Sequence, residues 1–260
     1  MTTTHYDIAV IGGGPGGYVA AIRAAQLGLN AAVVEREHLG GICLNWGCIP
    51  TKALLRAAEL RHSIDEMKSF GITVGEVTVD VPALVKRSRK VASRLSSGVT
   101  HLLKKNKIPV MEATATIGKK LKNGREVLLS DGTSISAGHV IIATGARARS
   151  LPGIVPDGTA ILTYCEAMVP QDMPKSLIIV GSGAIGAEFA SFYNDMGVEV
   201  TLIEALDRIL PVEDAEVSAF VAKSFEKRGM KIMTKVKLQS VVAGPDGVKA
   251  TLVGGDEELK

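Results

Sequence analysis

The pattern of apolar and polar positions predicts short buried strands that alternate with helices. A four-residue apolar run at 8–11 leads into glycines, an alanine-rich stretch ends at Gly28, and a second apolar run follows at 31–34. Apolar runs separated by helical stretches are typical of βαβ units with a parallel sheet. The same order recurs at 177–203. We therefore predict an α/β fold with two Rossmann-like units.

Between and after these units, the pattern predicts further helices, strands and turns. Helices are expected over 49–68, 81–105 and 214–227, and strands over 140–143 and from 230 to 253. Three dipeptides indicate tight turns: Asn123–Gly124, Asp131–Gly132 and Asp246–Gly247. A stretch rich in proline and glycine at 151–158 marks a linker. We predict two domains, 1–149 and 150–260.

The two βαβ units are an internal repeat, because residues 8–35 align with 177–204 without a gap. The alignment pairs five residues of each copy: Gly12 with Gly181, Gly14 with Gly183, Gly17 with Gly186, Gly28 with Gly197, and Glu35 with Glu204. In such a unit the glycines permit a tight turn, close approach of a pyrophosphate, and close packing of helix on strand.

The repeat predicts two dinucleotide sites. The pyrophosphate is expected at each helix N-terminus, where N–H groups and the helix dipole favour an anion. Glu35 and Glu204 end the second strands, where a carboxylate can accept hydrogen bonds from a ribose diol. Two ordinary glycine turns are the alternative, which the strand–helix context and the terminal acids disfavour. The pattern does not say which dinucleotide binds where.

Charge and histidine spacing exclude several other functions. Lys and Arg total 30 against 27 Asp and Glu, for a formal net charge of +3, and the short lysine runs carry no interleaved aromatic residues. A nucleic-acid surface is therefore not expected. The N-terminus has no secretory pattern and no apolar run could cross a membrane, so we expect a cytoplasmic protein. The five histidines lack ligand spacing, and we predict no metal site.

Two of the three cysteines, Cys43 and Cys48, lie five residues apart at the start of a predicted helix. A helix N-terminus stabilises a thiolate, and such a pair can cycle between dithiol and disulfide. A zinc site would need further ligands, which the chain does not offer at suitable spacing. Two inert core thiols remain an alternative. Cys165 has no cysteine nearby and is expected to be an ordinary thiol.

The segment GGICLNWGCIPTK at 40–52 resembles the redox-active disulfide motif of the pyridine nucleotide–disulfide oxidoreductase family. The first glycine unit, IIATG at 141–145 and the second glycine unit follow the family's order, so the resemblance covers essentially the whole chain. The residues of the motif are similar to those found in the branch of this family that oxidises dihydrolipoamide. Glutathione and mercuric reductases tend to have valine where Leu44 and Ile49 stand; mercuric reductase is the runner-up.

The resemblance implies a role for each motif residue. FAD would be held by Gly12, Gly14, Gly17 and Glu35, with Lys52 beside the flavin and Ala115 and Gly145 near it through their backbones. NAD would be held by Gly181, Gly183, Gly186 and Glu204, with Glu188 paired to Lys52. A carboxylate at 204 would repel the 2′-phosphate of NADP, which independently favours NAD.

The resemblance also implies a mechanism and partners. Dihydrolipoamide, carried on lipoyl domains of a 2-oxo-acid dehydrogenase complex, would exchange with Cys43, while Cys48 lies nearest the flavin. Electrons would pass to FAD and then to NAD. Family members form homodimers and continue beyond the position of Lys260 with a second flavin segment and an interface domain that supplies an acid–base histidine. None of the five histidines matches that residue. We therefore expect the 260-residue chain by itself to be inactive; a non-catalytic dinucleotide-binding fragment is the alternative.

Overall fold

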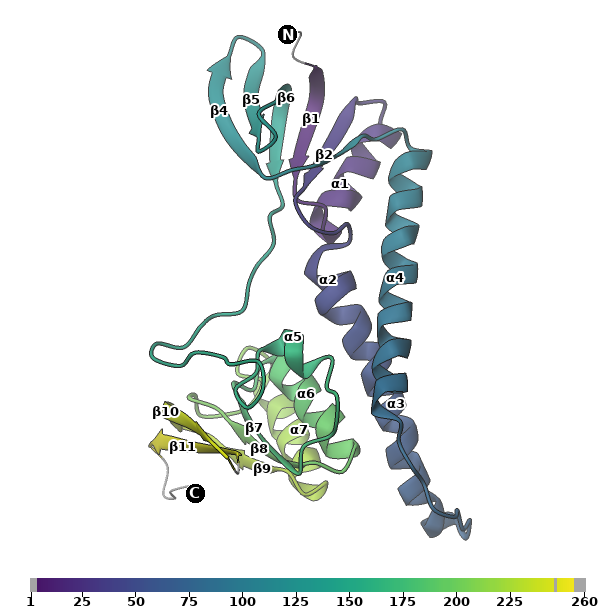
Figure 1. The fold of residues 1–260 in the computed structure, drawn as a ribbon, viewed down its shortest axis with the longest axis vertical. Helices are drawn as coiled ribbons and strands as arrows, with labels where there is room; N and C mark the ends of the chain where they lie inside the picture. Colours follow the sequence, from purple (N-terminus) through teal and green to yellow (C-terminus); the bar gives the residue numbers. More distant parts are fainter. Residues whose placement is uncertain (1–3, 246, 255–260) are drawn as a thin grey trace. The chain divides into compact units, whose positions relative to one another are not determined.

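The computed structural model describes residues 4–245 and 247–254, and its contacts divide the chain into two compact units (Figure 1). The first unit comprises the chain up to Pro50 together with Ser88–Arg147. The second comprises Thr51–Arg87 together with the chain from Ala148 onward.

The first unit is built on a six-stranded sheet in the order β3-β2-β1-β6-β5-β4. Neighbours are parallel from β3 to β6 and antiparallel from β6 to β4. The strands are β1 (His5–Ile11), β2 (Ala31–Glu35), β3 (Val110–Glu112), β4 (Ala115–Leu121), β5 (Gly124–Leu129) and β6 (Ser134–Ile142). The parallel pairs explain the unbroken apolar runs, because both faces of such strands are buried.

Alternate residues of β1 and β2 enter different cores. Val10 and Val33 pack with residues of helices α1 (Pro15–Gln26) and α4 (Val81–Lys105), including buried Leu103. Ala9 and Val34, one position further along, pack instead with residues of β5 and β6. Successive side chains of a strand point to opposite faces of the sheet, which explains this alternation. The end of β1 therefore lies between two packed layers.

Two helices lie between β2 and α4. The short helix α2 (Gly41–Trp46) is separated by Gly47 from the long helix α3 (Cys48–Glu66), which continues into a 3₁₀ turn at Met67–Phe70. The sequence correctly predicted α3 and α4 but did not distinguish α2. Cys43 therefore lies inside α2, and only Cys48 is at the start of the long helix.

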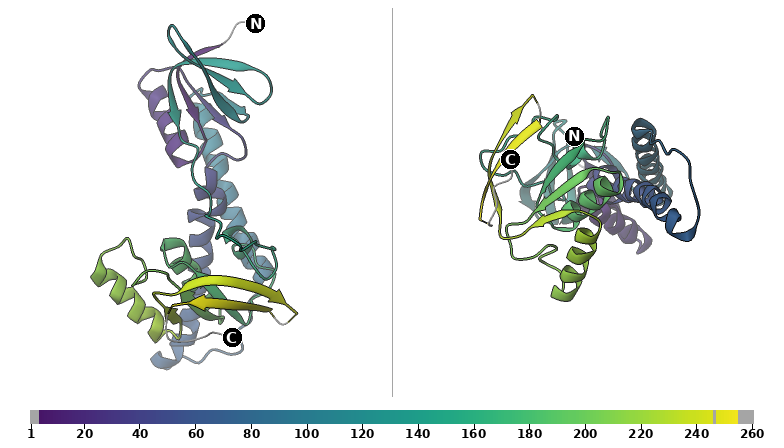
Figure 2. Two further views of the ribbon diagram at one scale, coloured as in Figure 1. Left: turned by 90° about the vertical axis from the view of Figure 1, so that its left-hand side faces the viewer. Right: turned by 90° about the horizontal axis from the view of Figure 1, so that it is seen from below.

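The second unit contains the other βαβ repeat (Figure 2). Its three parallel strands lie in the order β7-β8-β9 and are β7 (Ser176–Val180), β8 (Glu199–Ile203) and β9 (Lys231–Met233). Helix α6 (Ala184–Asp195) connects β7 to β8, and helix α7 (Ala215–Lys227) lies between β8 and β9 in the sequence. Strands β10 (Lys237–Gly244) and β11 (Gly247–Val253) form a separate antiparallel pair. The predicted turn between them includes Asp246, which lies outside the described residues.

The sequence missed the four-residue helix α5 (Tyr164–Ala167), whose start carries a recognisable signal. The Thr163 hydroxyl accepts from the Cys165 N–H, and the Glu166 carboxylate accepts from the Thr163 N–H at 2.8 Å. This reciprocal arrangement is a capping box, which the spacing Thr-x-x-Glu could have indicated. The hydroxyl of Thr163 and its backbone hold the pKa of the Glu166 carboxyl below its ordinary value.

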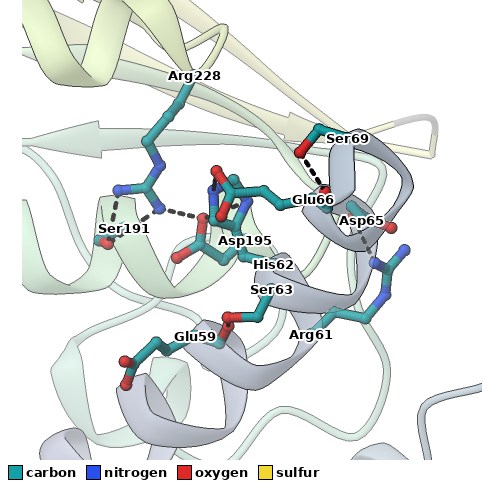
Figure 3. A network of polar contacts seen from close by, with 10 residues as sticks. All are labelled: Glu59, Arg61, His62, Ser63, Asp65, Glu66, Ser69, Ser191, Asp195 and Arg228. Atoms are coloured by element: carbon teal, nitrogen blue, oxygen red, sulfur yellow. Dashed lines mark hydrogen bonds and ion pairs between the residues drawn. The ribbon is translucent and has the colours of Figure 1, made fainter. Parts of the chain in front are cut away.

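Polar contacts explain why residues 51–87 group with the second unit (Figure 3). His62 on α3 has Nδ1 3.6 Å from a carboxylate oxygen of Asp195 on α6, and Nε2 3.5 Å from Glu66. Arg228, after α7, pairs with the same Asp195 and contacts Ser191 at 3.3 Å. Asp195 thus joins three helical segments that are distant in sequence.

The observed architecture confirms the predicted α/β class with parallel βαβ units. Among the described residues, no helix is both long and apolar enough to span a membrane.

Candidate functional site

The first glycine turn connects β1 to α1 through contacts that exclude any side chain. A Cβ at Gly12, where φ is +106°, would lie 2.1 Å from the carbonyl oxygen of Ala143. A Cβ at Gly17 would lie 1.8 Å from the carbonyl oxygen of Gly12. Real Cβ atoms do not approach oxygen so closely, so both positions require glycine. The turn is thereby pressed against α1 and against the segment after β6.

The N-terminus of α1 offers its N–H groups without a capping side chain. Gly14 occupies the N-cap position and Pro15 begins the helix. The first N–H groups of a helix have no partner within it, and glycine supplies none. An uncapped helix N-terminus of this kind is compatible with the predicted pyrophosphate site. A Cβ at Gly14 would meet only Gly41 Cα, at 3.7 Å.

Glu35 ends β2 with its carboxylate directed at this turn. One oxygen accepts from the Gly13 N–H at 2.6 Å, and the other accepts from the Glu37 N–H at 2.8 Å. The residue is half-buried. Because each carboxylate oxygen has a second lone pair, these bonds fix the side chain and leave acceptor capacity for a ribose hydroxyl.

The second glycine turn repeats this construction. Gly181 has a φ of +93°, Gly183 is the N-cap of α6, and a Cβ at Gly186 would lie 1.9 Å from the Gly181 carbonyl oxygen. The equivalent contact in the first unit joins Gly17 and Gly12. The sequence repeat is therefore also a repeat of backbone geometry.

Glu204 is held more firmly than Glu35, its equivalent. Its carboxylate accepts from the Ser182 N–H at 2.9 Å, the Ser182 hydroxyl at 2.7 Å and the Leu206 N–H at 2.9 Å. Only 7% of the residue is exposed. Burial by itself would raise the pKa of this carboxyl, but the hydrogen bonds outweigh burial and hold the pKa below its ordinary value. No sequence motif pointed to Ser182, whose hydroxyl has no counterpart at Gly13.

The cysteine motif lies against the first glycine turn. The Gly40 N–H donates to the Gly13 carbonyl at 2.8 Å, and a Cβ at Gly41, where φ is +56°, would lie 2.8 Å from Gly14 Cα. Cys43 is half-buried in α2 and Cys48 is exposed as the first residue of α3. The structure thus brings the predicted redox segment beside the predicted pyrophosphate site.

Lys52 and Glu188, predicted to pair, are in contact within the second unit. Lys52 Nζ donates to Glu188 Oε1, joining α3 to α6. The side chains are 61% and 30% exposed. An ion pair with this much solvent contact has a small effect on stability, so its geometry is better suited to placing a charge than to holding the fold.

Replacing this pair should change stability little. We expect Lys52→Met and Glu188→Gln each to alter the free energy of unfolding by about 1 kcal/mol or less, because exposed ion pairs contribute about 0–1 kcal/mol. Urea unfolding of both single variants and the double variant gives the coupling energy between the two side chains. A coupling above about 2 kcal/mol would contradict a mainly solvated pair.

The two remaining predicted FAD contacts lie in the first unit. Ala115 begins β4 and is half-buried. Gly145 is exposed, with a φ of +74°, two residues after Ala143, whose N–H donates to the Ile11 carbonyl at 2.8 Å. Gly145 therefore follows the strand end that contacts the first glycine turn, while the position of Ala115 adds no such contact.

Comparison with known proteins gives consistent matches over the whole chain. The family described as pyridine nucleotide-disulphide oxidoreductase matches residues 6–260. Dihydrolipoyl dehydrogenases of Zymomonas mobilis and Rhizobium etli are both 52% identical over 98% of this chain. The crystal structure of LpdA from Mycobacterium tuberculosis superposes with a TM-score of 0.86 at 30% identity, covering 98% of this chain and 56% of that one. The chain spans 55% and 56% of the two curated relatives.

Proposed function

The chain belongs to the pyridine nucleotide-disulphide oxidoreductase family, and from that premise we propose that it carries the cysteine pair and two dinucleotide sites of a dihydrolipoyl dehydrogenase. In that enzyme role, dihydrolipoamide would reduce the Cys43–Cys48 pair, and FAD and NAD, when bound, would take up the electron pair. The relatives that share 52% of its residues bear that enzyme's name. One observation carries the proposal: the backbone of the cysteine motif is hydrogen-bonded to the glycine turn that would hold FAD.

We assign FAD to residues 1–149 and NAD to residues 150–260. The first glycine turn shares a unit with Cys43 and Cys48, which supports placing the flavin nucleotide there. The residues present fit both cofactors, because Gly14 and Gly183 leave the N-termini of α1 and α6 without capping side chains. Gly12, Gly17, Glu35, Lys52, Ala115 and Gly145 would serve FAD; Gly181, Gly186, Glu188 and Glu204 would serve NAD.

The cysteines perform thiol–disulfide exchange in this proposal. A substrate thiolate attacks Cys43 of the Cys43–Cys48 disulfide, and the Cys48 thiolate leaves. The second substrate thiolate then attacks the mixed disulfide, releasing oxidised substrate and the Cys43 thiolate. Cys48 is the exposed first residue of α3. When bound, FAD and NAD supply the hydride chemistry that removes the electron pair.

Glu204 supports NAD rather than NADP. Its hydrogen bonds stabilise the ionised carboxylate, and an anion there repels a 2′-phosphate while it can accept from a free ribose hydroxyl. Neighbouring Asp207 adds negative charge, although it also lies 3.9 Å from the guanidinium of Arg208. The balance at the end of β8 remains acidic.

Partners and location follow from the same assignment. We propose action on lipoyl groups of a 2-oxo-acid dehydrogenase complex, homodimer formation by the whole protein, and a cytoplasmic location. The absence of turnover by the 260-residue chain alone stays a prediction. The relatives named dihydrolipoyl dehydrogenase favour this substrate over that of mercuric reductase.

Mild oxidation should link Cys43 to Cys48. Peptide mass mapping of the oxidised chain should recover this linkage, and Cys165→Ser should leave it unchanged because Cys165 lies in α5, away from the motif in sequence. A predominant bridge to Cys165, or persistence of all three thiols at full oxidation, would overturn the proposed electron route.

A further inference from the structure

The side chain of Arg89, on α4, contacts the four-residue segment that connects Cys43 to Cys48. The guanidinium of Arg89 donates to the backbone carbonyl of Asn45 and lies over the ring of Trp46, with Cζ 4.1 Å from the ring centroid. Both contacts fall on the segment that connects the two cysteines. Arg89 is half-buried, and a cation over an indole ring gains from partial desolvation.

The same segment is tied down by the Asn45 side chain. Its amide nitrogen donates to the carbonyls of Leu39 at 3.0 Å and Gly41 at 2.9 Å, so it bridges back to the start of α2. Its amide oxygen accepts from the Ser96 hydroxyl at 3.1 Å. Ser96 lies on α4, as does Arg89, so one helix holds both the side chain and the carbonyl of Asn45.

We propose that Arg89 is a positioning residue for the Cys43–Cys48 pair, and that its guanidinium makes the pair a stronger oxidant. The inference deepens the proposed function and rests on that pair being redox-active. Asn45 is two residues from Cys43 and three from Cys48. Because consecutive Cα atoms are 3.8 Å apart, the Cα of Asn45 lies at most about 8 Å from the Cα of Cys43 and at most about 11 Å from the Cα of Cys48.

The sign of the effect follows from charge. A disulfide is neutral, whereas the reduced pair carries negative charge once a thiol ionises. A nearby cation stabilises only the thiolate and therefore favours reduction. Stabilising the reduced form is also how a dithiol protein becomes a strong oxidant. Removing Arg89 should accordingly make the disulfide harder to reduce.

The test is a redox titration of the 260-residue chain against reduced and oxidised dithiothreitol, with thiol trapping and mass spectrometry of the peptides holding Cys43 and Cys48. Arg89→Gln should shift the exchange equilibrium about tenfold toward the protein disulfide, a fall of about 30 mV for this two-electron couple. Arg89→Lys, which keeps the charge but not the planar fork, should shift it about threefold. Lys90→Gln, which removes an exposed charge next to Arg89 on the same helix, should match the parent.

Each outcome decides something. An unchanged equilibrium in folded Arg89→Gln, or an equal shift in Lys90→Gln, overturns the inference but leaves the proposed function standing. Failure of the parent to form the Cys43–Cys48 disulfide at any ratio overturns the proposed function and the inference together. If circular dichroism shows that Arg89→Gln is unfolded, Arg89→Lys decides, and the absence of any shift there overturns the role of Arg89.

Discussion

Gly17→Ala should destabilise the first unit and abolish dinucleotide binding there, whereas Gly16→Ala should do neither. The new methyl at 17 would lie 1.8 Å from the Gly12 carbonyl oxygen, and Val10 is the next contact at 3.4 Å. Backbone must shift to admit it. Overpacking of this kind costs about 3 kcal/mol, or about 10 °C in Tm for a chain of this size.

Gly16 is a matched control because it is the adjacent residue of α1 and is exposed. A Cβ there meets nothing within 4 Å. Alanine in a helix is favoured over glycine by about 0.8–1 kcal/mol, so Gly16→Ala should be as stable as the parent or slightly more so. Thermal unfolding and FAD titration of the two variants measure the contrast. Equal behaviour would contradict the tight contact between α1 and the glycine turn.

Much of this site could be predicted because its requirements are local. A glycine is needed wherever φ is positive or a backbone oxygen is too near for a Cβ, and Gly12 and Gly17 meet those conditions within six residues of chain. The spacing from Gly12 to Glu35 likewise reflects one strand, one helix and one strand. Helix α4 was predictable from its start at Val81 to its end at Lys105 because its apolar period is long.

What could not be predicted depends on contacts between distant residues. Nothing local in residues 51–87 indicates that His62 lies beside Asp195, which groups this segment with the second unit. The hydrogen bond from the Arg89 guanidinium to the Asn45 carbonyl likewise joins residues far apart in sequence. Helix α2 was missed for a different reason: six residues carry too little periodicity to separate it from α3.

Glu35 and Glu204 illustrate both what the sequence could predict and what it could not. Their position at the ends of β2 and β8 was predicted, but their hydrogen bonds to the turn were not. The extra donor at Ser182 distinguishes the second site from the first, where the equivalent residue is Gly13. A single hydroxyl thus makes Glu204 part of the fold as well as a candidate ligand.

Glu204→Gln should lower the free energy of unfolding of the second unit by about 2–3 kcal/mol at pH 7, because hydrogen bonds to a charged group contribute about 1.5–3 kcal/mol. An amide has one acceptor oxygen, so it cannot satisfy donors on both sides. Its NH₂ group would face either Ser182 or the Leu206 N–H, donor against donor. NAD binding should weaken in the same variant because the ribose acceptor is neutral and displaced.

The stability lost in Glu204→Gln should be largest at neutral pH and should shrink as the pH falls. The folded-state pKa of Glu204 lies below the ordinary value of 4.5, so the unfolded chain binds the proton more tightly. The stability from the ionised carboxylate is therefore fully present above about pH 4.5 and is lost as the pH falls through the folded-state pKa. Urea unfolding at pH 7 and at progressively lower pH should show parent and Glu204→Gln converging.

Glu199→Gln is the matched control for Glu204→Gln, because Glu199 begins the same strand and is exposed. It should change stability by less than about 0.5 kcal/mol at any pH, as surface substitutions usually do. The comparison separates loss of a bound, buried carboxylate from loss of negative charge in general. Equal effects of the two variants, or a Glu204→Gln deficit that grows as the pH falls, would contradict the conclusion that the hydrogen bonds to Ser182 and Leu206 stabilise the ionised carboxylate.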